Sequence, residues 1–144
     1  MTHPQHILVA TCLVRNAAGA ILGVKHKIRG WELPQGRVEQ GEALLAALHR
    51  EVFEETGVTI AAPRLAALWS KLSEPTALIH GFVADYVAGT PTPSEETPEV
   101  AWLAEAELCA RVDHPVNADR LRDLLAFDGT LRFHAYRTGP YRRC

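Results

Sequence analysis

Three glutamates near the end of one predicted helix could together bind a divalent metal ion. At about 100° per residue, Glu51, Glu54 and Glu55 fall within a helical arc of roughly 100°. The last turn of a helix is the negative end of its dipole, where an exposed acid costs about 0.3–1 kcal/mol. Glu51 and Glu55 also repel each other, because residues four apart are neighbours on a helix. A solvated acidic face is the alternative, but a hard cation such as Mg²⁺ would turn this repulsion into ligation.

The helix that carries these glutamates is predicted to run from residue 42 to residue 55. This stretch contains no Pro or Gly, and its Leu and Val residues recur at helical spacing. Gly41 can lie at its start, with Glu42 in the first turn, where the helix dipole favours an acid. Gly57, just beyond the end, can adopt the left-handed conformation that terminates helices.

A longer pattern surrounds the cluster and reads Gly-x5-Glu-x7-Arg-Glu-U-x-Glu-Glu-x-Gly-U, in which U is a bulky apolar residue. It runs from Gly36 to Val58. A random window would meet its seven single-residue requirements with a probability on the order of 10⁻⁹. The pattern resembles the signature of the Nudix hydrolases, the Nudix box, at every defined position. Residues 31–36 and 95–103 also look like the family, and the resemblance covers residues 7–125.

The resemblance implies metal-dependent hydrolysis of a pyrophosphate bond in a nucleoside diphosphate linked to a further group X. Such a bond resists water because its negative oxygens repel a nucleophile. A divalent ion neutralises those oxygens, lowers the pKa of a bound water and orients it. We expect Mg²⁺, with Mn²⁺ as the alternative.

The family pattern assigns roles to individual residues of the box. The expected metal ligands are Glu51, Glu54, Glu55, the main-chain carbonyl of Gln35, and Glu96 in a later loop. One glutamate is also expected to take the proton from water, and spacing does not decide between Glu54 and Glu51.

Other box residues are expected to support the ligands. Gly36 would let the chain turn tightly, so that the Gln35 carbonyl faces the metal, or it is an ordinary turn glycine. Arg50 would orient carboxylates with its planar guanidinium. Glu42 is either a structural partner of Arg50 or a distant metal ligand through water.

Residues other than the defined positions of the box are candidates for further contacts. Glu95 and Glu99 are rivals of Glu96 as a ligand, and a solvated loop acid is the plainer reading of each. Four cations lie in or near the segment between the strand ending at residue 33 and the box helix (residues 34–41, the box loop). They could bind substrate phosphates, although each could also be surface charge: Lys25, Lys27, Arg29 and Arg37.

The bulk properties fit one domain spanning residues 1–144. A hydrophobic content of 47% and a formal net charge of −2 describe a soluble globular protein, a monomer or homodimer. Because the chain has no basic excess, we expect a small nucleotide as its partner rather than a nucleic-acid polymer. Its three cysteines lack metal-ligand spacing. The absence of a secretory leader pattern or long apolar stretch makes a cytoplasmic location the expectation.

The rest of the chain reads as strands interspersed with helices. This alternation fits a mixed sheet between helical layers, the three-layer α/β/α sandwich that the Nudix resemblance also implies. Beyond the box helix, helices are expected at 105–111 and at 118–127, the latter capped by Asn117. Strands are expected at 7–15, 20–27, 31–33, 58–60, 65–72, 77–87, 100–103 and 131–136.

Three functions compete. The first is a MutT-like hydrolase of (d)NTPs or related small nucleotides, acting in nucleotide-pool sanitation. The second is an RNA 5′-pyrophosphohydrolase or dinucleoside polyphosphate hydrolase. Gln35 supports it, because it stands where the commonest family form has Gly and Pro-Gln-Gly resembles those enzymes. The third, of another class, is a non-catalytic Nudix domain that senses a nucleotide.

Overall fold

The first strand lies in the middle of the sheet and has partners on both sides. In the computed structural model, which describes residues 2–144, β1 (Ile7–Arg15) pairs in parallel with β6 (Ala77–Ala88). On its other side it pairs antiparallel with the short strand β4 (Gln35–Arg37). Residues 10–14 of β1 are buried, as expected of a strand covered on both faces. The first strand therefore fixes the position of the box loop.

The sheet has the strand order β3-β2-β1-β6-β5-β8-β9, with β4 added beside β1 and β7 beside β2. It is mixed, because β1 with β6 and β5 with β8 are parallel pairs while the other pairs are antiparallel. The remaining strands are β2 (Ile21–His26), β3 (Gly30–Glu32), β5 (Thr59–Lys71), β7 (Glu99–Leu103), β8 (Arg132–Arg137) and β9 (Arg142–Arg143).

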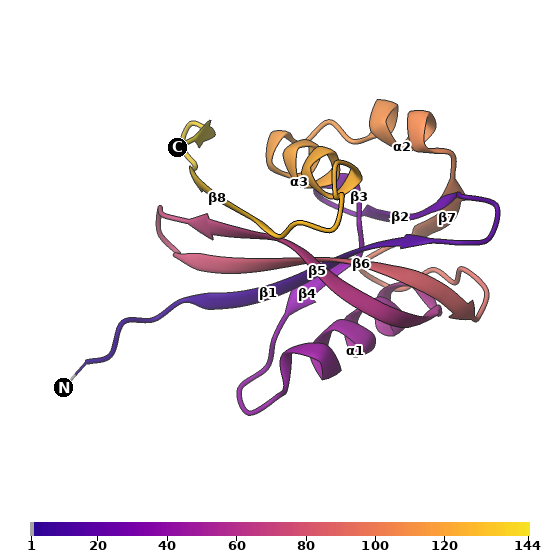
Figure 1. Cartoon of the computed structure of the whole chain (residues 1–144), viewed down its shortest axis with the longest axis horizontal. Coiled ribbons are helices and arrows are strands. Elements are labelled where there is room, and N and C mark those ends of the chain that lie inside the picture. Colours follow the sequence, from indigo (N-terminus) through magenta and orange to yellow (C-terminus); the bar gives the residue numbers. More distant parts are fainter. Residues whose placement is uncertain (1) are drawn as a thin grey trace.

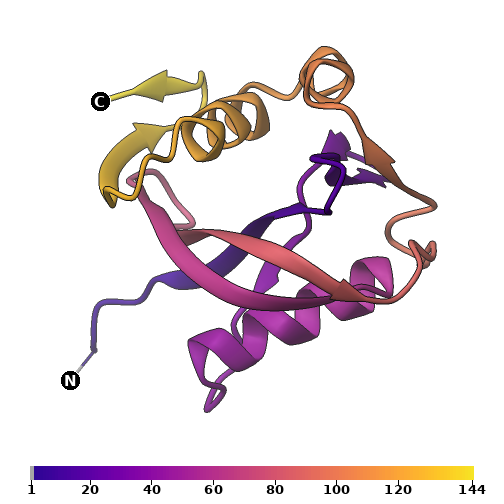
Figure 2. The same ribbon diagram turned by 45° about the vertical axis from the view of Figure 1, so that its right-hand side comes forward.

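Helices cover both faces of this sheet. Figure 1 shows α1 (Leu44–Thr56) on one side, and α2 (Glu105–Arg111) and α3 (Pro115–Leu125) on the other. The same layers are visible in the turned view of Figure 2. Two clusters of buried side chains fill the two interfaces, one beneath α1 and one beneath α2 and α3. The predicted α/β/α sandwich with a mixed sheet is confirmed.

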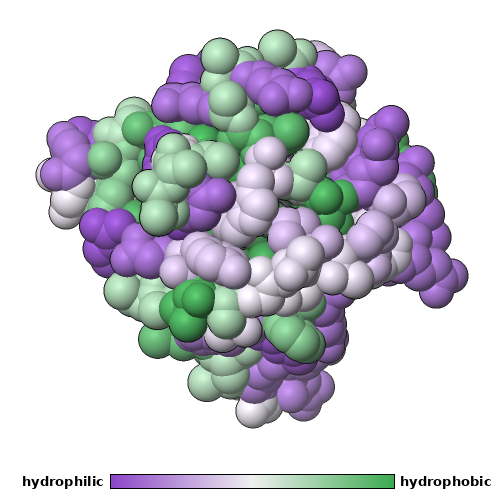
Figure 3. All heavy atoms as spheres, turned by 90° about the vertical axis from the view of Figure 1, so that its right-hand side faces the viewer, coloured by the Kyte–Doolittle hydropathy of each residue, from purple (hydrophilic) through white to green (hydrophobic). Residues whose placement is uncertain are grey.

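The surface is mixed in character. Figure 3 shows polar and apolar residues interleaved across the face at the right of Figure 1. None of the helices within residues 2–144 combines the length and the apolar character that a membrane span requires.

Several predicted element boundaries were wrong, each for a local reason. The box helix begins at Leu44 rather than at residue 42, because Gly41 adopts a left-handed φ of 79° and Ala43 is extended. Its end is as predicted: Gly57 has a φ of 76°, and its N–H donates to the carbonyl of Phe53 at 2.8 Å.

The predicted break between residues 60 and 65 is absorbed into one strand. The expected strands 58–60 and 65–72 join as β5, although Pro63 cannot donate to the ladder. The irregularity falls where it was expected, because the pairing register with β6 shifts between Ala61 and Arg64.

The predicted cap of the last helix was also wrong. Pro115 occupies the first turn of α3, where its missing N–H costs nothing, so Asn117 lies inside the helix and is buried. Strand β4 was not predicted, because its three residues read as loop.

Candidate active site

The three box glutamates project from the last turns of α1 into different environments. Glu54 is exposed, with 58% of its side-chain surface accessible. Glu51 is half-buried. Glu55 is 6% exposed, and its Oε1 accepts a hydrogen bond from the main-chain N–H of Gln35 at 2.8 Å. A helix and a strand are thereby joined through a buried carboxylate.

Gly36 has a different role from the predicted one. It lies within β4, opposite Ala10 of β1, and its φ is outside the left-handed region. A Cβ at this position would overlap the carboxylate of Glu51. The position therefore needs glycine because the Glu51 carboxylate packs directly against its backbone, and the predicted tight turn is not what requires it.

Arg50 binds carboxylates on both sides of the box. Its Nε and Nη2 donate to the two carboxylate oxygens of Glu42, at 2.7 and 2.8 Å. Its Nη1 donates to Glu51 at 2.8 Å and to Glu54 at 3.2 Å, and its Nη2 also reaches the carbonyl of Arg37 at 3.1 Å. Of the two alternatives for Glu42, the geometry matches the structural partner of Arg50. The bidentate pair fixes the guanidinium that orients the other acids.

Burial disfavours the charged form of two of these carboxylates. It raises the pKa of Glu55 to about 8, against the opposing effect of the Gln35 N–H, and the charges of Glu32 and Glu51 raise it further. Burial also raises the pKa of Glu51, although Arg50 opposes this. A nearby cation would favour the charged form of both groups.

The residues present fit a hard divalent cation. Within residues 2–144, no three His, Cys, Asp or Glu side chains converge as a ready-made metal site. However, Glu51 and Glu55 approach the adjacent residues Gly36 and Gln35, so two desolvated carboxylates flank one short strand. All the donors are oxygens, which is the donor chemistry of Mg²⁺ and Mn²⁺.

The loop that carries Glu96 is attached to the end of the box helix. The hydroxyl of Thr97 donates to the carbonyl of Glu55 at 2.9 Å, and the N–H of Lys27 donates to the carbonyl of Glu96 at 3.1 Å. The side chain of Glu96 is exposed. Its rival Glu99 instead forms an ion pair with Lys25 at 3.3 Å.

A cavity of about 380 Å³ opens beside the box loop, between the sheet and α3. Apolar side chains of β1 and β6, among them Val9 and Ile79, line part of it. Its cationic lining residues are Arg29, Arg37, Lys71 and Arg120.

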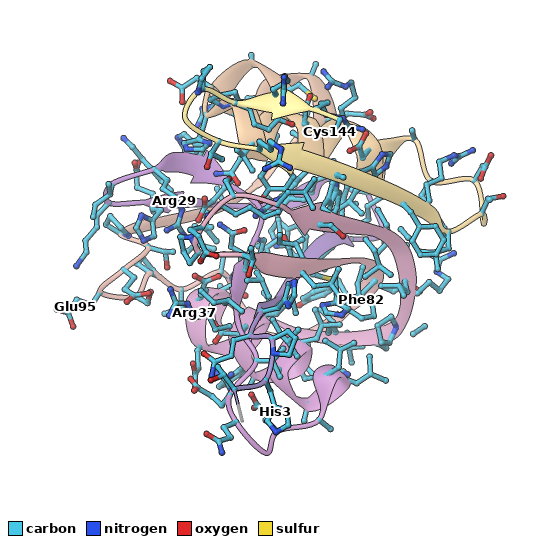
Figure 4. The ribbon with its side chains drawn as sticks, turned by 90° about the vertical axis from the view of Figure 1, so that its left-hand side faces the viewer. His3, Arg29, Arg37, Phe82, Glu95 and Cys144 are labelled. Carbon is cyan, nitrogen blue, oxygen red and sulfur yellow. The ribbon has the colours of Figure 1, made fainter. Side chains whose placement is uncertain are left out.

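The four predicted phosphate-binding cations divide into two pairs. Arg29 and Arg37 line the cavity and lie on the same side of the molecule in Figure 4. Lys25 and Lys27 are exposed and lie outside its lining. Glu95 projects at the outer edge of the same view.

Sequence reasoning missed a buried carboxylate next to the box. Glu32 is 1% exposed and accepts two hydrogen bonds from the guanidinium of Arg29, at 2.9 and 2.8 Å. It also accepts from the side-chain amides of Asn117 at 2.7 Å and Gln35 at 3.1 Å. Its place between two apolar residues was the only signal of burial.

Arg120 of α3 was missed as well. Its Nη1 donates to the side-chain oxygen of Gln35 at 2.6 Å, and its Nη2 donates to the hydroxyl of Tyr136 at 3.0 Å. No local pattern could have identified it, because 85 positions separate it from Gln35.

Comparison with known proteins supports the family resemblance of the sequence pattern. A family model described as the NUDIX domain matches residues 5–125. A MutT-like protein of Streptomyces ambofaciens is 31% identical over 124 residues, which cover 85% of this chain and 79% of that protein.

Two further relatives share shorter segments. An 8-oxo-(d)GTP phosphatase of Mycolicibacterium smegmatis is 29% identical over 93 residues, or 64% of this chain and 29% of that protein. An RNA pyrophosphohydrolase of Caulobacter vibrioides is 40% identical over 63 residues, or 41% of this chain and 37% of that protein. The matches thus cover less than half of either relative.

Solved structures share the fold. A MutT protein from Bacillus halodurans superposes with a TM-score of 0.80 at 24% identity, covering 95% of this chain and 97% of that one. A Nudix hydrolase from Nitrosomonas europaea gives a TM-score of 0.75 at 25% identity, covering 92% and 81%. The box, the family match and the shared fold lead to one conclusion: the chain belongs to the Nudix family and is a Nudix hydrolase.

Proposed function

We propose that this hydrolase cleaves a phosphoanhydride bond in a small nucleotide, a nucleoside diphosphate linked to a further group, with the help of a divalent ion. One observation carries the proposal: β4 borders both the acidic cluster and the cavity. Gln35 binds Glu55 and Gly36 lies against Glu51, while both strand residues also line the cavity. A polyphosphate in the cavity would therefore lie beside the carboxylates.

The ion would be held by oxygen atoms of the box and of one later loop. In an extended strand, the N–H and C=O of one residue point to the same side. Since the Gln35 N–H points at Glu55, its carbonyl is directed the same way. Mg²⁺ or Mn²⁺, when bound, would neutralise phosphate oxygens and acidify a water. The proposed ligands are the carbonyl of Gln35 and the carboxylates of Glu51, Glu54, Glu55 and Glu96.

Glu54 is the better candidate for the group that takes the proton from water. Its side chain is exposed, so a water molecule can reach it. Arg50 binds both carboxylates, but Glu51 is less exposed and packs against Gly36, which suits a fixed ligand more than a proton acceptor. Arg50 acts on the chemistry through the carboxylates that it orients.

The cavity favours a nucleotide over a simple pyrophosphate. Its apolar wall can accept a nucleobase, and Arg29 and Arg37 can bind phosphates at the side nearest the box. A (d)NTP or a related small nucleotide is the proposed substrate. Action on oxidised nucleotides, as in nucleotide-pool sanitation, has support from the Mycolicibacterium smegmatis relative, which is an 8-oxo-(d)GTP phosphatase.

Hydrolysis of RNA 5′ ends or of dinucleoside polyphosphates is the second candidate. It has support from the identity with an RNA pyrophosphohydrolase, which is 40% over 63 residues. Gln35, the residue that favours this candidate in the sequence, gives it little support from its geometry. Its side-chain amide hydrogen-bonds Glu32 through the nitrogen and Arg120 through the oxygen.

The test is a substrate panel with purified protein and either Mg²⁺ or Mn²⁺. The panel contains nucleoside triphosphates with normal and oxidised bases, nucleotide sugars, dinucleoside polyphosphates and triphosphorylated RNA. Glu54→Gln should lower kcat by about 10²–10⁴-fold, because it removes a proton acceptor without changing shape. The matched control is Glu107→Gln on α2, an exposed helical glutamate paired with Arg111, and it should keep full activity.

The outcomes separate the candidates. Turnover of free nucleotides without turnover of RNA supports the leading proposal, and the reverse pattern supports the second. Wild-type protein that binds nucleotides but hydrolyses none of the panel with either metal would contradict both, and would favour a non-catalytic sensor.

A further inference from the structure

Gln35 is held by the protein at three of its atoms. Its main-chain N–H donates to Glu55 at 2.8 Å. Its side-chain oxygen accepts from Arg120 at 2.6 Å, and its side-chain nitrogen donates to Glu32 at 3.1 Å. Backbone and side chain of one box-loop residue are therefore attached to three separate elements, α1, α3 and β3.

Arg120 connects this residue to the C-terminal part of the chain. Its second amino group donates to the hydroxyl of Tyr136, a β8 residue that is 3% exposed. Tyr136 follows the segment that the family model matches, which ends at residue 125. A strand beyond the matched region thus reaches the box loop through one arginine side chain.

The surroundings of Arg120 lower the stability of the fold, so stability alone does not explain an arginine at this position. It forms no ion pair with a carboxylate in residues 2–144, and its Nε is buried there without a hydrogen-bond partner. A buried polar atom without a partner destabilises the folded state, because it has lost its hydrogen bonds to water. An apolar side chain would avoid that cost, but it could not hold Gln35 and Tyr136 together.

We propose that Arg120 and Tyr136 are positioning residues that hold the side chain of Gln35 and thereby fix the box loop against α1. We call these three residues the Gln35 clamp. The clamp orders the main-chain N–H that Glu55 binds and the carbonyl that follows it. Its catalytic consequence rests on the proposed function, in which that carbonyl and Glu55 are metal ligands. Its structural consequence, an ordered strand β4, does not.

The structural part is tested by amide hydrogen exchange on metal-free protein. Arg120→Met keeps an unbranched, flexible apolar stem and removes the guanidinium donors, so exchange at Gln35–Arg37 should accelerate about tenfold or more. Arg122→Met is the matched control, because Arg122 lies on the same helix and its side chain is 69% exposed. It should leave exchange in β4 unchanged. Unchanged exchange in Arg120→Met, or equal acceleration in both variants, would overturn the clamp.

The catalytic part is tested by a double-mutant cycle with Gln35→Leu and Arg120→Met. Loss of groups that orient metal ligands costs about 10–100-fold, so each single variant should lower kcat by about tenfold. The kcat of the double variant should lie within about twofold of the kcat of the less active single variant, because both substitutions remove the same connection. A loss of kcat of about a hundredfold in the double variant would mean that the two single losses multiply. That result, or a rise in KM with unchanged kcat in Arg120→Met, would overturn the clamp and make Arg120 an independent substrate contact.

Tyr136→Phe provides a milder variant that keeps the packing of the ring. It should shift kcat and exchange in the same direction as Arg120→Met, by a smaller factor. No shift in either quantity would remove Tyr136 from the clamp and overturn that part of the proposal. If wild-type protein hydrolyses no nucleotide at all, the proposed function fails, and the exchange experiment still decides whether the clamp orders β4.

Discussion

At the scale of single residues, the site depends on close packing between backbone and carboxylate. Gly36 leaves the space that the Glu51 carboxylate occupies, and Gln35 gives its main-chain N–H to Glu55. The sequence pattern predicted that both glycine and glutamate are needed, because the pattern is local. It could not predict that they touch, since this depends on how β4 packs against α1.

This packing gives a prediction about stability. Gly36→Ala should lower the free energy of unfolding by about 1–3 kcal/mol, because the new methyl group overlaps Glu51. In a Glu51→Ala background the same substitution should cost less than about 1 kcal/mol, since the obstacle is gone. Urea denaturation of the four proteins measures both values. Equal costs in the two backgrounds would mean that Glu51 is not what excludes a side chain at position 36.

At the scale of elements, α1 was largely predictable because helical periodicity and a glycine stop are local signals. The misplaced start and the unpredicted β4 came from interactions that the local pattern does not contain. Glu42 lies outside the helix, where it binds Arg50 and the main-chain N–H of Glu39. Strand β4 exists because β1 offers it a partner.

The glycine at the end of α1 gives a prediction at this scale. Gly57→Ala should destabilise the protein more than Gly41→Ala, although the two glycines have nearly the same φ, 76° and 79°. Each substitution should lower the free energy of unfolding by about 1–2 kcal/mol, because alanine disfavours the left-handed conformation. A Cβ at 57 would also come within 3.0 Å of Thr90 and Thr92, whereas nothing lies within 4 Å at 41.

The difference between the two variants isolates the packing of the loop against the helix end. In thermal or urea unfolding, the free energy of unfolding of Gly57→Ala should be about 1 kcal/mol or more below that of Gly41→Ala. Equal destabilisation would show that backbone strain alone accounts for the effect, and that the loop at 90–92 adjusts freely.

At the scale of the whole molecule, the cavity is assembled from segments far apart in the sequence. Strand β1, the box loop, β6, α3 and β8 each contribute to its lining. The layered fold could be predicted from alternating strands and helices. The hydrogen bonds of Asn117 to Glu32 and of Arg120 to Gln35 could not, because each joins residues 85 positions apart.

The burial pattern of the fold predicts which thiols react. Cys12 is fully buried in β1, and burial raises the pKa of its thiol far above the usual range, whereas Cys109 and Cys144 are exposed. Iodoacetamide at pH 8 should therefore modify two cysteines of the native protein and the third only after unfolding. Mass spectrometry of the alkylated peptides identifies them. Modification of native Cys12 at the rate of the other two would contradict the buried position of β1.

The contribution of β8 to the cavity has a consequence for synthesis. A chain leaves the ribosome N-terminus first, at about 5–20 residues per second. Strand β1, the box loop and α1 are complete once Thr56 has emerged, but Tyr136 and Thr138, which also line the cavity, follow several seconds later. During that interval the nascent protein carries its acidic cluster without the last part of the cavity lining, so the complete cavity forms only after β8 has docked.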